Sequence, residues 1–394
     1  MQSVITTDLT PCIFVSGREV VKRELRQQSQ GFGVDTLSGG PYSKTTMLGS
    51  TLSAGVSLTA QSGGSLLELL EPIAAELPRV EVALANQVNG FDPRLAEQIH
   101  YILGGAGKRL RPSLVLLAGG TTGGITEQHI TLAVIVELIH VATLVHDDVL
   151  DEADLRHRLP TSNSRWGNEI SVLLGDCLFA HALRLAASYP TTEVCRRVSE
   201  ATNTVCSGEI VQTQRRFDLD LTLEEYLDII NMKTGALFAV SCELGAFLNG
   251  APSNIVKRMN EFGTNLGIAY QIYDDCVDIF GQERQAGKSL GTDMKKGKLT
   301  LPFLLLLQHV SSESRQELGA MILRNGQQEQ QDLLRLVLGN GVVGESLATI
   351  DTYISRARAS LSALPSNDYT RTLAALTDYL SGQSRSLLKE AAAT

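Results

Sequence analysis

Two groups of aspartates with the same spacing are the residues of this sequence best suited to bind metal ions. Asp147, Asp148 and Asp151 form the first Asp-Asp-x-x-Asp cluster. On a helix, positions four apart share a face, so the side chains of Asp147 and Asp151 project together. A divalent cation would relieve their mutual repulsion, and carboxylate oxygens suit Mg²⁺. A solvated acidic helix end would explain this cluster equally well.

The second cluster, Asp274, Asp275 and Asp278, repeats this spacing far along the chain. It lies in the apolar stretch GIAYQIYDDCVDIF, where a freely solvated acidic face is not expected. Two matching clusters on separate helices therefore predict a diphosphate held by metal ions between them.

A diphosphate site also needs cations, and the chain supplies them in three places. Residues 104–112 form a glycine-rich turn with three basic residues, in which glycine allows close approach to an anion and arginine offers bidentate contacts. An ordinary helix start is the alternative for this turn. Lys233 lies within an apolar stretch, where an unpaired lysine would be costly. The glycine-bearing segment after the second cluster, which we interpret as a lid, contains Lys288, Lys295, Lys296 and Lys298.

The elements that position these residues are predicted to be helices throughout. From Ser65 onward apolar residues recur with a helical period, without convincing β-alternation or an internal repeat. Predicted helices include residues 131–151, 170–187, 194–213, 223–248, 255–280 and 299–310, with breaks at Gly119-Gly120, Pro160, Pro190 and residues 250–252. Thr222 and Glu225 have the form of a capping box. We predict one all-α domain over residues 65–394.

Residues 1–64 differ from the rest, because they are rich in Ser, Thr and Gly and show no sustained helical period. Their acidic residues nearly balance their basic ones, which favours a flexible tail over an organelle transit peptide. With a tail the protein is predicted to be cytoplasmic, and with a transit peptide it would enter a plastid or mitochondrion.

The composition is that of a globular protein, with 43% apolar and 20% charged residues. A net charge of −9 argues against general binding to nucleic acid or anionic membranes. No uncharged apolar run reaches the roughly 18 residues of a membrane span, so no transmembrane segment is predicted. The six cysteines show no CxxC pairing and fall mostly in apolar stretches, so we expect reduced, buried thiols.

Seven short motifs occur in the order seen in trans-polyprenyl diphosphate synthases: GAGKRLRP, HDDVLDEADLR, LLGD, GEI, KTGAL, YQIYDDCVD and GKSLGTDMKKGKLTLP. The chain resembles this family over roughly residues 65 to 390, and within it the long-chain members that make quinone side chains. The resemblance implies a helical bundle of the isoprenoid synthase type with a central active-site cavity, and a homodimer. It also implies isopentenyl diphosphate and an allylic prenyl diphosphate as substrates, with two to three Mg²⁺ ions per site.

The resemblance further implies a role for each matching residue. The catalytic residues would be Asp147, Asp148, Asp151, Asp274, Asp275 and Lys233. The metal ligands would be Asp147, Asp151, Asp274 and Asp278. The isopentenyl diphosphate head group would bind Lys108, Arg111 and His140, and the allylic diphosphate would bind Arg156, Lys233, Thr234, Gln271, Lys288 and Lys298. The family usually has a second consecutive arginine where this chain has His157, a predicted substrate-binding residue, so either Arg158 replaces it or the isopentenyl diphosphate site is weakened.

In this reaction, cations would neutralise the departing diphosphate, an apolar cavity would shield the carbocation, and isopentenyl diphosphate would attack it. The product is again allylic, so the cycle repeats until the cavity ends. Ala142 lies about 7.5 Å beneath Asp147 by helical rise, beside Thr143 and close to Ile139. An aromatic residue there would stop the chain early, whereas alanine predicts a product of about C30 or longer.

Three other functions remain open on sequence grounds. A di-iron helical bundle could use the motifs Glu97-x-x-His100 and Glu137-x-x-His140 with Glu209 and Glu243, but it leaves both aspartate clusters unexplained. A terpene cyclase shares the aspartate-rich magnesium chemistry but lacks a separate basic site for isopentenyl diphosphate. A non-catalytic subunit of a heteromeric synthase would typically lose one aspartate cluster, and both are present here.

Overall fold

The computed structural model describes residues 66–391, apart from 106, 157–158, 282–290 and 325. These residues belong to one compact unit. Residues 1–64 lie outside the described residues, so their predicted role and the cytoplasmic location stay predictions.

The first part of the described chain is helical except for one small hairpin. Its α-helices are α2 (Leu66–Leu69), α3 (Leu77–Ala85), α4 (Ala96–Leu103), α5 (Leu110–Thr122), α6 (Glu127–Leu150), α7 (Ser162–Trp166), α8 (Asn168–Ala187) and α9 (Thr192–Gln214). Short 3₁₀ turns cover Glu71–Ile73, Asn86–Gly90 and Pro93–Leu95. The antiparallel hairpin of β1 (Leu155–Arg156) and β2 (Leu159–Pro160) follows the first aspartate cluster.

The second part contains α10 (Leu223–Ile230), the π-helical turn η4 (Asn231–Gly235), α11 (Ala236–Phe247), α12 (Ser253–Phe280), α14 (Thr292–Lys295), α15 (Leu301–His309), α16 (Ser312–Arg324), α17 (Gln327–Gly339), α18 (Val342–Leu361) and α19 (Asp368–Ala391). The all-α prediction is confirmed, since β1 and β2 are the only strands in the described residues.

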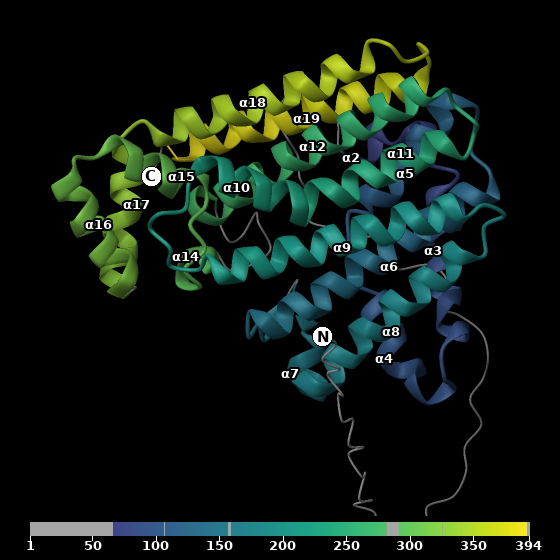
Figure 1. The fold of residues 1–394 in the computed structure, drawn as a ribbon, viewed down its shortest axis with the longest axis horizontal. Coiled ribbons are helices and arrows are strands. Elements are labelled where there is room, and N and C mark those ends of the chain that lie inside the picture. Colours follow the sequence, from purple (N-terminus) through teal and green to yellow (C-terminus); the bar gives the residue numbers. More distant parts are fainter. Residues whose placement is uncertain (1–65, 106, 157–158, 282–290, 325, 392–394) are drawn as a thin grey trace, which may run out of the picture. The chain divides into compact units, whose positions relative to one another are not determined.

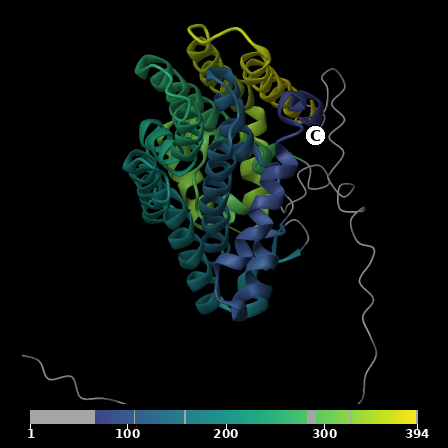
Figure 2. The ribbon, with the colours of Figure 1, turned by 90° about the vertical axis from the view of Figure 1, so that its right-hand side faces the viewer.

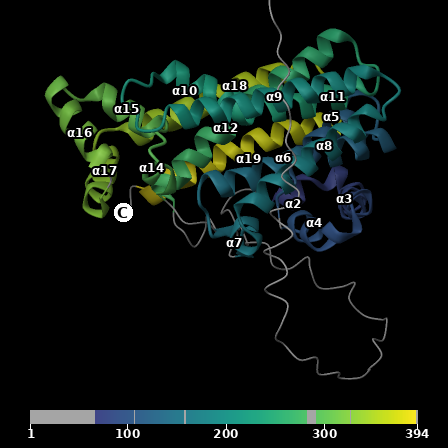
Figure 3. The same cartoon turned by 60° about the horizontal axis from the view of Figure 1, so that its bottom comes forward.

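The two helices that carry the aspartates lie at the centre of the helical packing. Helix α6 packs against α5 and α8, and α11 contacts α5, α6 and α12 (Figure 1). Helices α18 and α19, yellow in Figure 2, lie together and both pack against α12. Helices α16 and α17 lie together beyond α15 (Figure 3). Because α6 is apolar on nearly all sides, it is buried on nearly all sides.

The predicted break at Gly119-Gly120 is wrong, because α5 continues to Thr122 and the chain turns at Gly123-Gly124. Both glycines are sites of close packing instead. A Cβ on Gly119 would lie 2.4 Å from the His129 ring, and one on Gly120 would lie 2.3 Å from the Tyr369 ring. A glycine pair in a helical sequence can therefore indicate the close approach of neighbouring side chains rather than the end of the helix.

The predicted helix over residues 223–248 is interrupted in its middle. Thr222 and Glu225 form the predicted capping box, with each side chain accepting from the other residue's backbone N–H. The helix then widens into the π turn Asn231–Gly235 before α11 begins. Such turns are frequent at functional sites, and this one contains Lys233 and Thr234.

Two helices, α6 and α8, are long and apolar enough to cross a membrane by length and composition. The bent pair Gln328–Gly339 and Val342–Leu361 passes the same test as a broken span. Neither helix contains the uncharged run that the sequence analysis required, because both include acidic residues. Within the protein, 72% of the tested window of α6 is buried, but only 39% of that of α8. Core packing thus accounts for the apolar character of α6, whereas α8 keeps apolar residues exposed.

The described cysteines are all free, as expected. Burial raises the pKa of the Cys242 and Cys276 thiols, which keeps them protonated. The expectation of buried thiols is wrong for Cys206, which is exposed on α9.

We expect Gly263→Ala to destabilise the protein at the crossing of α11 and α12. The added Cβ would lie 2.5 Å from the carbonyl oxygen of Phe238, and backbone cannot move aside cheaply. Overpacking of this kind costs roughly 1–3 kcal/mol in the free energy of unfolding, measured by denaturant titration. Gly382→Ala in α19 is the matched control, because nothing lies within 4 Å of its Cβ. That variant should be more stable by roughly 0.5–1 kcal/mol, and equal effects of both changes would contradict the close packing.

Candidate active site

The first aspartate cluster lies at the C-terminal end of α6, where its outer members face cations. Asp151 Oδ1 accepts from Arg216 Nη2 at 3.1 Å, and its Oδ2 lies 3.1 Å from the Nζ atoms of both Lys296 and Lys298. Burial alone would raise the pKa of Asp151, but Lys298 and Lys296 outweigh burial and lower it. The carboxylate is therefore ionised and held by three cations.

The middle member, Asp148, points toward the hairpin instead. It is 5% exposed and accepts from Arg156 Nε at 2.9 Å and Nη2 at 2.8 Å. This bidentate pair holds the predicted diphosphate ligand Arg156 at the end of α6. Its contacts give Asp148 a positioning role, and its catalytic role stays a prediction.

Lys233 reaches the first cluster from the π turn. Its Nζ pairs with the Glu209 carboxylate, donates to Gln212 Oε1 at 3.0 Å, and lies 3.8 Å from Asp147 Oδ2. Gly208 permits this approach, because a Cβ there would lie 2.8 Å from the backbone N of Lys233. Burial lowers the pKa of Lys233, but Asp147 and Glu209 outweigh burial and raise it, so the ammonium stays charged.

Thr234, the next residue, connects the π turn to the second cluster on α12. Its Oγ1 donates to Gln271 Oε1 at 2.7 Å, and Gln271 Nε2 donates to Asp275 Oδ1 at 2.7 Å. Tyr226 completes the chain by donating its hydroxyl to Asp275 Oδ2 at 2.6 Å. Burial, together with the charge of Asp293, raises the pKa of Asp275 to about 8. Asp275 therefore positions Gln271 from within the core.

The last member of the second cluster organises the segment that follows it. Asp278 is 2% exposed, and its carboxylate accepts from Thr292 Oγ1 and from the backbone N–H of Asp293, each at 3.1 Å. These contacts begin α14 and occupy both oxygens of Asp278. Asp274, on the same helix, is half-buried. Metal ligation by Asp274 and Asp278 stays a prediction.

The glycine-rich turn before α5 forms a separate basic site. Arg109 adopts φ +47° and is held by Glu81 and the buried Glu137, at 2.6 Å each. A left-handed conformation is rare for arginine, and here it occurs at the N-cap of α5, between Lys108 and Arg111. The pair with Glu137 thus fixes the geometry of this turn.

Arg111 and His140 line the inner side of that basic site. The Arg111 guanidinium lies over the Phe238 ring at 4.9 Å, and its buried Nε has no hydrogen-bond partner among the described residues. Burial lowers the pKa of His140 well below its usual range, and the charge of Arg111 adds to this effect. An orphaned guanidinium donor fits a site for an anion.

Three of the predicted positions cannot be placed, because His157, Arg158 and Lys288 lie outside the described residues.

The predicted chain-length residues lie beneath the first cluster on α6. Ile139 and Ala142 are fully buried, and Thr143 is half-buried with its hydroxyl donating to the His140 carbonyl at 2.7 Å. A larger side chain at Ala142 would thus enter the packed interior. Their control of product length stays a prediction.

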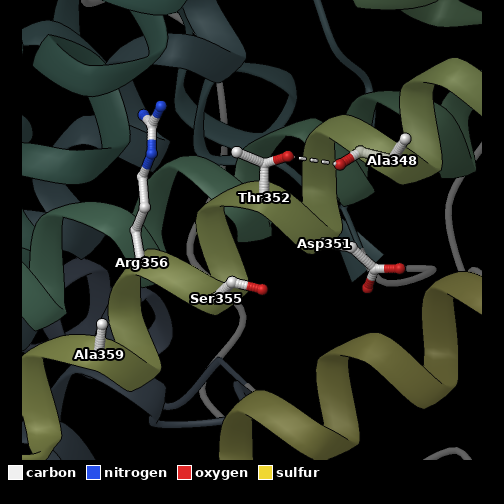
Figure 4. Close-up of a pocket in the computed structure, with 6 residues that line it drawn as sticks. All are labelled: Ala348, Asp351, Thr352, Ser355, Arg356 and Ala359. Atoms are coloured by element: carbon white, nitrogen blue, oxygen red, sulfur yellow. Dashed lines mark hydrogen bonds between the residues drawn. The ribbon is translucent and has the colours of Figure 1, made fainter.

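A groove of about 630 Å³ lies away from these residues, along one face of α18. Figure 4 shows its lining, which contains none of the predicted site residues: Ala348, Asp351, Thr352, Ser355, Arg356 and Ala359. Thr352 donates its hydroxyl to the Ala348 carbonyl of the same helix. The groove offers no cluster for diphosphate chemistry, and the predicted central cavity stays a prediction.

The carboxylates of this site suit a metal ion that is bound partly by the protein and partly by the substrate. Within the described ranges, no three His, Cys, Asp or Glu side chains lie close enough to hold an ion by themselves. Mg²⁺ typically takes one or two carboxylates, keeps waters and shares phosphate oxygens, which suits Asp147 and Asp151.

The di-iron alternative is wrong, because it needs glutamates that converge on metal ions. The four candidate glutamates instead pair with separate cations: Glu97 with Arg165, Glu137 with Arg109, Glu209 with Lys233 and Glu243 with Arg197. In the described residues, these glutamates do not gather with histidines into a group that could hold a metal ion.

Three residues of the site were not predicted from the sequence, namely Gln212, Arg216 and Tyr226. Glu209 was considered only as a ligand of the di-iron alternative, and not as a partner of Lys233. Glu209 and Gln212 are three apart on α9, so a search for polar residues on one helical face could have found them. Arg216 and Tyr226 carry no such signal, because their partners are far away in the sequence.

Comparison with known proteins identifies the family. Residues 92–337 match the family model described as polyprenyl synthetase. The chain is 33% identical over 314 residues to octaprenyl diphosphate synthase of Escherichia coli (strain K12), which covers 79% of this chain and 97% of the relative.

Two solved structures are similar over most of their length. A decaprenyl diphosphate synthase from Rhodobacter capsulatus is 31% identical, with a TM-score of 0.75 over 80% of this chain and 98% of that one. A polyprenyl synthase from Caulobacter crescentus CB15, complexed with calcium and isoprenyl diphosphate, is 31% identical, with a TM-score of 0.77 over 82% and 99%. Such enzymes typically use a divalent metal. Sequence, fold and site thus agree that this chain belongs to the polyprenyl synthetase family.

Proposed function

We propose that this protein is a trans-polyprenyl diphosphate synthase that adds isopentenyl diphosphate repeatedly to an allylic prenyl diphosphate. Its similarity to octaprenyl and decaprenyl diphosphate synthases supports a long-chain product, for which we propose a length of about C30 or more and a use in quinone side chains. The metal is Mg²⁺, with two to three ions per site.

One observation carries the proposal: polar contacts connect the two distant aspartate clusters along two routes. On the first route, Asp147 lies beside Lys233, and the neighbouring Thr234 reaches Asp275 through Gln271. These contacts bring an ammonium, a hydroxyl and an amide into the space between α6 and α12.

The second route runs through the segment after α12. Asp151 pairs with Lys298, whose backbone N–H donates to the Asp293 carbonyl at 2.9 Å, and Asp293 donates in turn to Asp278. Cations and carboxylates thus surround one region from both sides, which is the arrangement that a metal-bound diphosphate requires.

Each group of residues has a distinct task in the reaction. A bound divalent metal would supply positive charge that stabilises the departing diphosphate. Lys233, Lys298 and Arg156 hold this leaving group by charge-assisted hydrogen bonds. Thr234 contributes a hydroxyl and Gln271 a side-chain amide beside this leaving group.

The second substrate binds at the separate basic site. Arg111 donates to the diphosphate of isopentenyl diphosphate, and Lys108 adds a second positive charge. Neutral His140 can donate a hydrogen bond without adding charge repulsion. The apolar faces of α5, α6 and α11 exclude water from the carbocation.

This second site also separates the proposal from a terpene cyclase, which acts on one allylic substrate. Incubation of the purified protein with Mg²⁺ and C10, C15 or C20 primers, with and without labelled isopentenyl diphosphate, tests the function directly. Elongated products that form only with isopentenyl diphosphate support the synthase, and cyclised products without it would show a cyclase.

Product length should shorten when bulk is added beneath Asp147. Ala142→Phe places a ring about 7.5 Å below the metal site and should reduce the main product from C30 or longer to about C15 or C20, sized by chromatography after dephosphorylation. Ala142→Ser adds little volume and should keep the wild-type products. Thr143→Phe serves as a second variant if Ala142→Phe fails to fold. Unchanged products from folded variants would show that this turn of α6 does not limit the chain.

Activity should depend on divalent metal and on the outer aspartates. We expect chelation to abolish turnover and Mg²⁺ to restore it. Asp147→Asn should lower kcat by roughly 10²-fold or more, because an electrostatic contact in the transition state is lost. Asp378→Asn in α19, an exposed acid paired with Arg358, is the control and should keep wild-type kcat. Full activity of Asp147→Asn would exclude this residue from the metal site.

We also propose a homodimer that covers the exposed apolar side of α8 and α9. Leu173 and Ile210 are each 59% exposed, and Ile170 is 43% exposed. Apolar residues gathered on one side of a protein often mark an interface.

This dimer can be tested by light scattering after size exclusion. Leu173→Glu should convert the dimer to a monomer, because a charge would be buried in the interface. Leu323→Glu in α16 changes an equally exposed leucine and should leave the dimer intact. A wild-type monomer would refute the dimer, and a dimer that survives Leu173→Glu would place the interface elsewhere.

A further inference from the structure

The loop between α9 and α10 is fastened to the turn that carries Lys296 and Lys298. The backbone N–H of Phe217 donates to the Gly297 carbonyl at 2.7 Å. The Phe217 ring covers Gly297, since a Cβ on Gly297 would lie 2.4 Å from it. We call this contact the Phe217–Gly297 latch.

Both residues of the latch adopt backbone conformations that side chains disfavour. Phe217 has φ +60° and Gly297 has φ +72°. The left-handed region is ordinary for glycine but uncommon for a bulky residue, and such strain persists only where surrounding contacts enforce it. The geometry of the latch is thus specific to this pair.

The neighbours of the latch residues converge on one carboxylate. Arg216 precedes Phe217, and Lys296 and Lys298 flank Gly297. Each lies 3.1 Å from an oxygen of Asp151. The latch therefore brings cations from two distant segments onto a single predicted metal ligand.

This arrangement has more positive than negative charge. At Asp151 itself, three cations meet one carboxylate. Asp293 lies 4.0 Å from Lys298, and Asp147 is paired with Lys233 instead. Arg216 also has a buried Nε without a partner in the part of the chain that the structure describes. A divalent cation arriving alone at Asp151 would be repelled, whereas a diphosphate would bring the missing negative charge.

We propose that Arg216 and Lys296 are positioning residues which guard Asp151 until a diphosphate arrives. Held by the Phe217–Gly297 latch, they occupy the carboxylate in the empty enzyme and transfer to phosphate oxygens when substrate binds. Asp151 then becomes available to a metal ion. This inference rests on the proposed function, and it adds a device that makes metal binding at Asp151 depend on the diphosphate.

The test measures metal binding without substrate. Mn²⁺ binding to the full-length protein is followed by titration calorimetry, with no diphosphate present. Arg216→Gln and Lys296→Gln should each tighten the Kd for Mn²⁺ by roughly threefold to tenfold, because a competing cation is removed. In turnover assays the same variants should raise the KM for the allylic diphosphate by roughly threefold to tenfold, because a phosphate contact is lost.

The opposite directions of these two effects separate the proposal from a structural role, which would weaken both kinds of binding. Arg215→Gln is the matched control. Arg215 is the adjacent arginine and pairs with Asp218 and Glu225 instead, so both constants should stay at their wild-type values. Gly297→Ala, checked for folding by its melting temperature, should reproduce both effects by breaking the latch. Phe217→Ala is the second variant if that change unfolds the protein.

Unchanged or weaker Mn²⁺ binding by Arg216→Gln and Lys296→Gln would overturn the guarding role. An unchanged KM in folded Gly297→Ala and Phe217→Ala would overturn the role of the latch. Failure of the proposed function is recognised separately, as a wild-type protein that forms no elongated product.

Discussion

Carboxylates can be placed inside an apolar helical bundle only where cations or hydrogen-bond donors meet them, and the site depends on this constraint. Each aspartate at the end of α6 has its own cationic neighbour: Asp147 has Lys233, Asp148 has Arg156, and Asp151 has Lys298 among others. Because these cations come from the hairpin, the π turn and the segment after α12, the same pairs that stabilise the acids also join distant parts of the chain.

The members of each aspartate cluster have different surroundings despite their shared spacing. Asp151 faces the cations of two loops, whereas Asp148 anchors Arg156. In the second cluster, Asp275 holds Gln271 and Asp278 begins α14. The clusters therefore combine residues that can bind a metal with residues that position others. A spacing motif alone does not distinguish these roles, since they depend on which neighbour each side chain meets.

Glycines decide how closely the elements approach at the site. Gly208 allows α9 to reach the backbone of Lys233. A Cβ added to Gly267 would lie only 2.9 Å from the Cα of Gly235, so glycine at this position lets α12 approach the π turn. This close packing brings Thr234 within hydrogen-bond distance of Gln271. The π turn sets the direction in which the Lys233 and Thr234 side chains point. It lies where the apolar period of the sequence predicts an uninterrupted helix.

The sequence predicts the helical fold, the family, and the residue types of the diphosphate site, because periodicity and short motifs depend on neighbouring residues. It did not determine the end of α5 or the interruption after α10, since long-range packing overrides local signals there. The contacts of Arg216 with Asp151 and of Tyr226 with Asp275 emerge from the three-dimensional packing of the helices. These partners lie far apart in the chain, and the preference of an ion or a hydroxyl for a partner carries no information about which distant residue will provide it.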